Sequence, residues 1–250
     1  MERPFIINTI TDSSLEKEMN PFDIEFEDTI YEYYGSKVPR VTHILSSMLH
    51  EDYLMGWANF VGRIKHMDHT IVADDAANIG SYTHKFIEEF LKFGKDPDFE
   101  SVPRQYKSKV YNAFGAFIRW WKVISQHNVE ILMIEEPLVC RYYGGTCDLL
   151  LKVDGMIYLV DFKTSNHLSY KYHLQAAAYR RVLYTEKNIT IDGVIILQLS
   201  KVNSVFNEQM LRFNKYEDLI YMNQCDQCFM SLVYGYYNRV KVEAQYKNFS

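Results

Sequence analysis

Hydrophobic residues recur with a helical period in the first half of the chain, from Val38 onward. In the clearest stretch, Ile79, Phe86, Ile87 and Phe90 fall on one face of a helix, which Gly94 is expected to end. Thr42 is a suitable N-terminal cap for a shorter helix nearer the start. The predicted helices of this half are 41–49, a continuation through Trp57 and Phe60, 74–93 and 104–126.

The pattern changes to short apolar runs after residue 127. Such runs, bounded by turn residues, are typical of strands. This order of elements predicts an α/β fold, a central mixed β-sheet flanked by helices with a helical N-terminal region. Strands are predicted at 131–139, 146–153, 156–164, 193–199 and 204–212, with helices at 170–184 and 216–240.

Charge separates the first residues from the rest. Residues 1–36 contain nine acidic residues and two basic ones, which gives them a net charge of −7. The whole chain has a net charge of −5, so residues 37–250 have a net charge of +2. We therefore predict an acidic N-terminal extension (1–36) and one domain (37–250), made of a helical part (38–127), a sheet core (128–215) and a C-terminal helix (216–240). Net charge alone does not exclude nucleic acid as a partner.

Composition excludes several classes of protein. No run approaches the roughly 18 consecutive apolar residues of a membrane span. The N-terminus lacks the basic, apolar and small-residue sequence of a signal peptide. Four cysteines in 250 residues do not suggest a disulfide framework. We expect no membrane partner and a cytoplasmic location, which for a phage protein is the host cytoplasm.

Residues 144–165 carry the candidate chemistry. Asp154-Gly155 between two apolar runs predicts a two-residue hairpin turn. That turn pairs Val153 with Met156 and places Asp148 directly opposite Asp161, with Lys163 further along the same face.

Two opposed carboxylates in apolar strands repel one another unless a cation lies between them. A divalent cation with oxygen ligands satisfies this requirement, and Lys163 adds positive charge. The alternative is that Asp148, Asp161 and Lys163 are polar positions on a solvent-facing sheet surface. A turn of odd length would also move Asp148 to the other face.

The order of these residues resembles the PD-(D/E)XK nuclease superfamily. Asp148 precedes Asp161-Phe162-Lys163, and Gln175-x-x-x-Tyr179 follows on a helix. The RecB-like branch, with phage and mitochondrial exonucleases, is most similar, since Gly80-x-x-x-His84 and residues 38–45 resemble its other motifs. The resemblance covers residues 38–185 and implies a restriction-endonuclease-like core.

The resemblance also implies roles for these residues. Asp148 and Asp161, with His84 and the main-chain carbonyl of Phe162, are expected to hold one or two Mg²⁺ or Mn²⁺ ions. Lys163 is expected to position or deprotonate the attacking water or to stabilise charge on the phosphate. Gln175 and Tyr179 are expected to support the catalytic group.

Each secondary assignment has a plain structural alternative. His84 could be an ordinary surface or core histidine, and Gln175 with Tyr179 could line the polar side of an amphipathic helix. Cys225 and Cys228, spaced for a metal or cluster, are expected to be core residues instead. The other candidates are Glu88 and Glu136 near the site, Thr164 and Ser165 for phosphate, and Lys107, Lys109, Arg119 and Lys122 for DNA.

These expectations favour a metal-dependent DNA exonuclease acting on single strands or duplex ends in recombination, repair or replication, where a replication or recombination protein is an expected partner. One rival is a structure-specific endonuclease with the same site. Another is a catalytically silent DNA-binding or assembly subunit, which the intact Asp148, Asp161 and Lys163 disfavour.

Overall fold

The computed structural model describes residues 29–49 and 68–247. The predicted helical segment at Trp57 and Phe60, and most of the predicted acidic extension, lie outside these residues. No helix among the described residues is both long and apolar enough to cross a bilayer.

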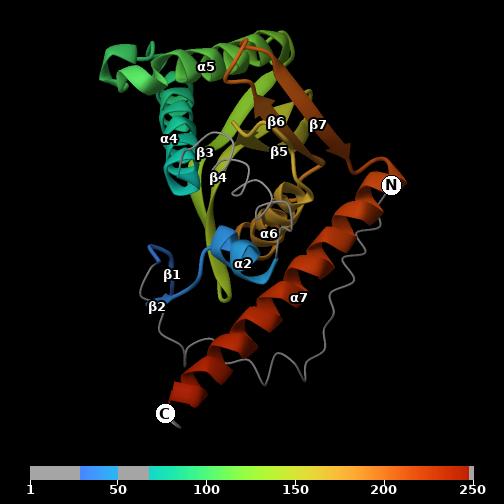
Figure 1. The fold of residues 1–250 in the computed structure, drawn as a ribbon. Helices are drawn as coiled ribbons and strands as arrows, with labels where there is room; N and C mark the ends of the chain where they lie inside the picture. The colour runs from blue at the N-terminus through green and yellow to red at the C-terminus, as the bar shows by residue number, and fades with distance from the viewer. Residues whose placement is uncertain (1–28, 50–67, 248–250) are drawn as a thin grey trace.

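A five-stranded mixed sheet forms the centre of the molecule (Figure 1). Its strands lie in chain order, and all neighbouring pairs are antiparallel except the parallel pair β5 and β6. Helix α6 makes the crossover that a parallel pair requires. The strands are β3 (Val129–Cys140), β4 (Tyr143–Val153), β5 (Met156–Lys163), β6 (Gly193–Leu199) and β7 (Phe206–Arg212).

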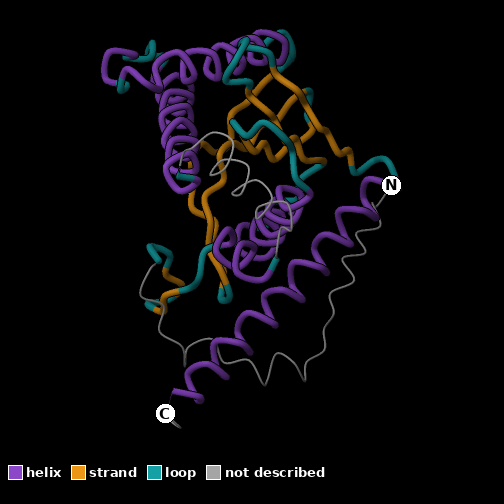
Figure 2. Tube along the Cα trace, viewed as in Figure 1, coloured by secondary structure: helices purple, strands orange, loops and turns teal. Residues whose placement is uncertain are grey.

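The helices lie in two layers, one on each face of the sheet (Figures 1 and 2). Helices α4 and α5 cover one face, and α2, α6 and α7 cover the other. The α/β class predicted from the sequence, with a mixed central sheet flanked by helices, is therefore confirmed. The helices are α2 (Val41–Met48), α4 (His69–Phe93), α5 (Arg104–Ile124), α6 (Tyr170–Lys187) and α7 (Tyr216–Lys247), and a 3₁₀ turn spans Phe99–Ser101.

Helix ends differ most from prediction. Helix α4 begins five residues earlier than predicted, because the Asp68 side chain accepts a hydrogen bond from the Thr70 amide. It ends at Gly94 as expected, where a φ of 61° suits glycine. The expected capping role of Thr42 is wrong, since α2 is preceded by Arg40 and has no side-chain cap.

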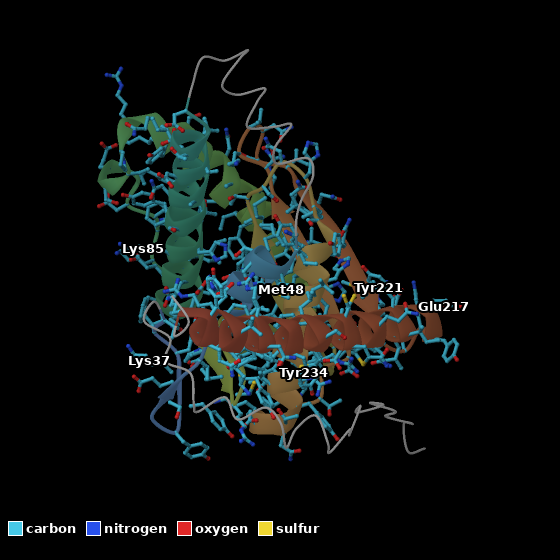
Figure 3. All side chains as sticks on the ribbon, turned by 60° about the horizontal axis from the view of Figure 1, so that its bottom comes forward. Lys37, Met48, Lys85, Glu217, Tyr221 and Tyr234 are labelled. Carbon is cyan, nitrogen blue, oxygen red and sulfur yellow. The ribbon has the colours of Figure 1, made fainter. Side chains whose placement is uncertain are left out.

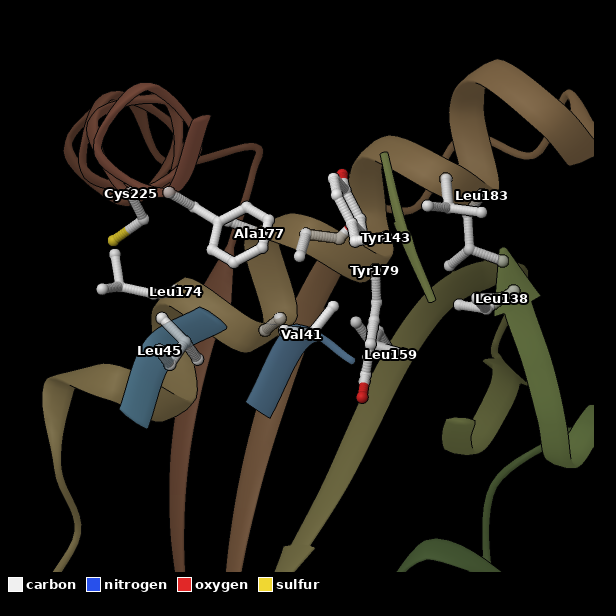
Figure 4. Packing of buried hydrophobic residues seen from close by; sticks show 14 of the residues in the cluster. Val41, Leu45, Leu138, Tyr143, Leu159, Leu174, Ala177, Tyr179, Leu183 and Cys225 are labelled. Atoms are coloured by element: carbon white, nitrogen blue, oxygen red, sulfur yellow. The ribbon is translucent and has the colours of Figure 1, made fainter. Parts of the chain in front are cut away.

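Helix α7 is longer than predicted and spans the whole α6 side of the molecule (Figure 3). Its neighbour α6 contributes a small-residue stretch, Ala176–Ala178, to the cluster in Figure 4, which lets the two helices approach closely. The Arg181 guanidinium and the Asp226 carboxylate form a bidentate ion pair between the same two helices.

The predicted boundary after residue 36 falls inside a small hairpin, β1 (Glu32–Tyr33) and β2 (Ser36–Lys37). The Tyr31 and Thr146 hydroxyl groups share a hydrogen bond of 2.7 Å, which ties this hairpin to β4. The last residues of the predicted extension are therefore in contact with the sheet.

Candidate metal centre

The centre lies where the β4–β5 ladder ends. Asp154 and Gly155 both have positive φ, 50° and 84°, as the predicted turn requires. Pairing runs from Val153 with Met156 to Leu149 with Val160, which confirms the predicted register. Asp148 and Asp161 come one residue beyond the last of these pairs, so the expected direct pairing of the two is not part of the ladder. The Asp148 side chain bridges the strands there by accepting from the Phe162 N–H, whereas Asp161 pairs with Ile196 of β6.

The Asp148 side chain is the hub of the centre. Its Oδ2 accepts a hydrogen bond of 2.7 Å from the main-chain N–H of Phe162. Its Oδ1 lies 3.5 Å from Nδ1 of His84. The residue is only 8% exposed, so these contacts are made away from bulk water. This geometry contradicts the alternative that Asp148 is a solvent-facing polar residue.

His84 contacts Asp148 from helix α4, in the α4–α5 layer on one face of the sheet. Its Nδ1 lies 3.3 Å from Oε1 of Glu135, and its Nε2 lies 3.2 Å from the carbonyl oxygen of Phe162. The ring also packs edge-on against the Phe162 ring. The structure therefore brings His84 and the Phe162 carbonyl together with Asp148, and their role as metal ligands stays a prediction.

Glu135 completes the cluster, and the sequence did not single it out. Pairing of Ile134 with Leu149 and of Glu136 with Cys147 places Glu135 level with Asp148 across the ladder. Glu135 has a φ of 50°, and its half-buried side chain meets His84. Glu136, the strand glutamate considered from the sequence, is exposed.

His84, Glu135 and Asp148 each offer one ligand atom, and these atoms lie within 4.8 Å of one another. Among the described residues, this is the one group of three or more side chains placed to hold a metal ion. It contains neither Cys225 nor Cys228. Two carboxylates and an imidazole, beside a main-chain carbonyl, suit Mn²⁺ and Mg²⁺ better than soft metals. Cys225 is buried as expected, whereas Cys228 is exposed, so the expectation of a core residue is wrong for Cys228.

Asp161 and Lys163 form an ion pair beside this cluster. Lys163 Nζ donates to Asp161 Oδ1 at 2.9 Å and lies 2.8 Å from Oδ2. Oδ2 is buried and accepts no hydrogen bond beyond this ion pair, so it retains a lone pair for another partner. Asp161 is outside the three-residue group, and its role as a metal ligand stays a prediction.

Lys163 is held in place by α6. Its Nζ donates to Oε1 of Gln175 at 3.2 Å and lies 4.8 Å from the centre of the Tyr172 ring. Gln175 Nε2 in turn donates to the Tyr179 hydroxyl at 3.0 Å. Gln175 and Tyr179 are buried, which contradicts the alternative that they line a solvated helix face.

No family model matches this chain, and no curated protein does either. The contacts described above must therefore carry any functional argument by themselves.

The pKa values in the centre follow from burial and charge. Burial alone would lower the pKa of His84, but Asp148 and Glu135 raise it to about 10. Burial raises the pKa of Asp161 to about 6, against the opposing effect of Lys163 and with a further increase from Asp148. Burial would also raise the pKa of Asp148, but the positive charges of His84 and Lys163 keep it lowered.

The remaining sequence candidates lie further from the cluster. Glu88 forms an i, i+4 ion pair with Lys92 at 2.9 Å, as a solvated acid on a helix does. Lys107 pairs with Glu100, while Lys109, Arg119 and Lys122 are exposed. The Ser165 hydroxyl donates to the His167 carbonyl and accepts a hydrogen bond from Tyr172.

Proposed function

We propose that this protein is a metal-dependent DNA nuclease with a restriction-endonuclease-like core, acting as an exonuclease that hydrolyses phosphodiester bonds. The supporting observation is the convergence of His84, Glu135 and Asp148 beside Lys163, although these residues come from four different elements. An ion pair with a purely structural role would need one acid and one base, whereas two acids, a histidine and a lysine meet here. Three carboxylates, of which Asp148 and Asp161 are buried and Glu135 is half-buried, face the two cationic side chains of His84 and Lys163, and a divalent cation would compensate the charge that remains.

The residues present fit a divalent cation. His84, Glu135 and Asp148 would hold it. Two further oxygens lie beside them: the Phe162 carbonyl, which is 3.2 Å from the other ring nitrogen of His84, Nε2, and Oδ2 of Asp161, which Lys163 also approaches. When bound, Mg²⁺ or Mn²⁺ supplies charge stabilisation on the phosphate and a more acidic water.

Lys163 acts in this proposal as a fixed positive charge. Burial would lower the pKa of its ammonium group, but Asp161 and Asp148 outweigh burial and raise it. A lysine with a raised pKa is a poor proton acceptor at neutral pH. We therefore assign to Lys163 the orientation of the attacking water and the stabilisation of negative charge on the phosphate.

The test of this proposal is digestion of end-labelled single- and double-stranded DNA by the full chain in Mg²⁺, Mn²⁺ or EDTA. We expect cleavage with either metal and none in EDTA. Asp161→Ala should cleave far more slowly than the wild type. Absence of cleavage with both metals, or equal cleavage by Asp161→Ala, would show that the proposal is wrong.

The two rival functions give different results in the same assay. A structure-specific endonuclease would cut closed circular DNA, which offers an exonuclease no end. A catalytically silent subunit would bind DNA without hydrolysing it in any metal.

Replacing Glu135 should weaken metal binding. In Glu135→Gln, the metal concentration that gives half-maximal cleavage should rise about 10- to 100-fold, the loss typical when a group that supports a metal site is removed. The adjacent, exposed Glu136 offers a matched control, and Glu136→Gln should leave that concentration unchanged. Equal behaviour of the two variants would remove Glu135 from the centre.

Adding a methyl group at Gly145 should displace Tyr179. A Cβ built at Gly145 lies 2.4 Å from Cε1 and 2.5 Å from the hydroxyl of Tyr179, so the buried ring must move. Gln175 and then Lys163 would shift with it, and a displacement of about 1 Å can cost about 10²-fold in rate. We expect kcat for cleavage to fall by that order in Gly145→Ala.

Tyr179→Phe separates ring position from hydroxyl chemistry. It keeps the ring in its place and removes the hydroxyl that accepts from Gln175. It should therefore lose less activity than Gly145→Ala. A Gly145→Ala variant with wild-type kcat would show that Tyr179 does not position Lys163.

A further inference from the structure

A polar pocket lies next to the metal centre, at the carboxyl ends of the parallel strands β5 and β6. It has a volume of about 360 Å³. Its walls are formed by the residues just after β5, by the end of β6, by the β6–β7 loop and by the first residues of β7. Ligands of open α/β sheets commonly bind at this end of parallel strands.

Short contacts connect the pocket to the centre. Lys163 and Gln198 are partners across the parallel ladder. Tyr172, whose ring lies under the Lys163 ammonium group, donates its hydroxyl hydrogen to Ser165 Oγ at 3.1 Å. Gln198 Nε2 donates to the Ser165 carbonyl oxygen at 2.8 Å. Ser165 and Gln198 both line the pocket, so a ligand there would lie close to Lys163.

The outer wall of the pocket is fixed by α5. Asn112 Nδ2 donates to the carbonyl oxygens of Lys201 and Val202 at 3.1 and 3.0 Å. Its Oδ1 accepts from the Ser204 hydroxyl at 3.1 Å. Gly115, one helical turn along, leaves room for Ser204, because a Cβ there would lie 2.9 Å from its hydroxyl oxygen. The β6–β7 loop is thus held in one place before any ligand binds.

The lining combines three kinds of group. Amide side chains come from both walls, and none of the ten lining residues is acidic. Lys201 supplies a positive charge that pairs with no described carboxylate. Burial lowers the pKa of its ammonium group, and the positive charge of nearby Lys109 lowers it further. Phe206 supplies an aromatic ring, and Val202 and Val205 supply exposed apolar surface.

We propose that this pocket binds one unpaired nucleotide of the DNA strand, next to the phosphate at the metal centre. The Gln198 and Asn207 amides share a hydrogen bond of 3.3 Å, and each keeps a second N–H and a lone pair. These groups and the Asn166 amide can pair with the donor and acceptor edge of a base, a ring can stack on Phe206, and Lys201 can meet a phosphate. A site for a simple anion would need the Lys201 ammonium group but neither the Phe206 ring nor the amide side chains. This inference rests on the proposed nuclease function and specifies how its strand is held.

Binding without metal tests the pocket separately from cleavage. The full chain, labelled with ¹⁵N and kept in EDTA, is titrated with thymidine monophosphate and, in parallel, with inorganic phosphate. We expect the side-chain amide signals of Gln198 and Asn207 to shift with the nucleotide, and phosphate alone to bind at least tenfold more weakly. Equal binding of phosphate and nucleotide would overturn the nucleotide assignment.

Two substitutions test which residues hold the nucleotide. Lys201→Gln removes the charge, and Phe206→Leu removes the ring while retaining apolar volume. In EDTA, each should weaken the binding of a short single-stranded oligonucleotide about three- to tenfold. Lys187→Gln, at the far end of α6, is the matched control and should bind as the wild type does.

The outcomes separate this inference from the proposed function. Unchanged oligonucleotide binding in both pocket variants would overturn the inference, even if metal-dependent cleavage is present. If binding depends on Lys201 and Phe206 but no metal supports cleavage, the pocket assignment stands and the nuclease function is wrong.

Discussion

The proposed cleavage of DNA is expected to fall at least about a thousandfold in Asp148→Asn. Asp148 contacts His84 and the Phe162 amide and lies level with Glu135, and its charge raises the pKa values of His84, Asp161 and Lys163. Asparagine keeps an oxygen for the Phe162 amide but removes the charge that would hold a cation in the proposed centre. A metal contributes several kcal/mol to the stabilisation of the transition state, and each 1.36 kcal/mol is a factor of ten in rate.

Asp192 offers a closely matched control. It is as buried as Asp148, and its Oδ2 accepts a main-chain hydrogen bond from Ile157, at the other end of β5. Asp192→Asn should therefore cost similar stability and leave the cleavage rate unchanged. Rates are measured with end-labelled DNA in Mg²⁺, below the melting temperature of all three proteins. A comparable loss of activity in both variants would indicate a folding defect and contradict the role of Asp148.

Truncation of Phe117 should produce the largest loss of stability. Its ring is fully buried on α5 and packs against the rings of Phe162, Trp121 and Phe90. The carbonyl oxygen of Phe162 borders the candidate metal centre. Removing such a ring leaves a cavity between helix and sheet. Phe117→Ala should lower the free energy of unfolding by about 3–5 kcal/mol, measured by urea denaturation.

Phe93 is the control for this truncation. It ends α4 and is 75% exposed, so Phe93→Ala should change the free energy of unfolding by less than about 0.5 kcal/mol. A loss below about 1 kcal/mol in Phe117→Ala would mean that α5 does not pack on the sheet as described.

The hairpin was predictable because its turn has a strong local signal. Asp154-Gly155 is a turn that tolerates positive φ at both positions, and a two-residue turn fixes which residues lie level across the strands. The register from the Val153–Met156 pair to the Leu149–Val160 pair therefore followed from a few adjacent residues, although the pairing ends one residue before Asp148 and Asp161. The strand limits of β6 were predicted for a similar reason, since an uninterrupted apolar run is typical of a buried strand.

Glu135 was not predictable in the same way. The turn between β3 and β4 consists of Arg141 and Tyr142, which carry no strong turn signal, so the register of this pair could not be derived. A register shift between Ile131 and Met133 also interrupts the alternation of faces along β3. The choice between Glu135 and Glu136 depended on these two features, which only the three-dimensional structure supplies.

Hairpin register and helical periodicity did not predict which side chains contact one another within the centre, although the resemblance had placed His84 and Gln175 there. Opposed positions suggested that Asp148 and Asp161 share one cation. In the structure Asp148 contacts His84 from the α4 layer, and Asp161 contacts Lys163, which Gln175 from the α6 layer also holds. Contacts between layers depend on how the helices pack on the sheet, and helical periodicity does not encode that packing.

The centre draws its groups from both helical layers and from the strands between them, and this has a consequence during synthesis. His84 emerges from the ribosome long before Gln175, and β6 must still be added before the parallel pair can form. Contacts so distant in sequence form late in folding. The proposed cleavage activity would thus be absent from the nascent chain and would appear only once the sheet is complete, so an unfinished chain would not cut nucleic acid.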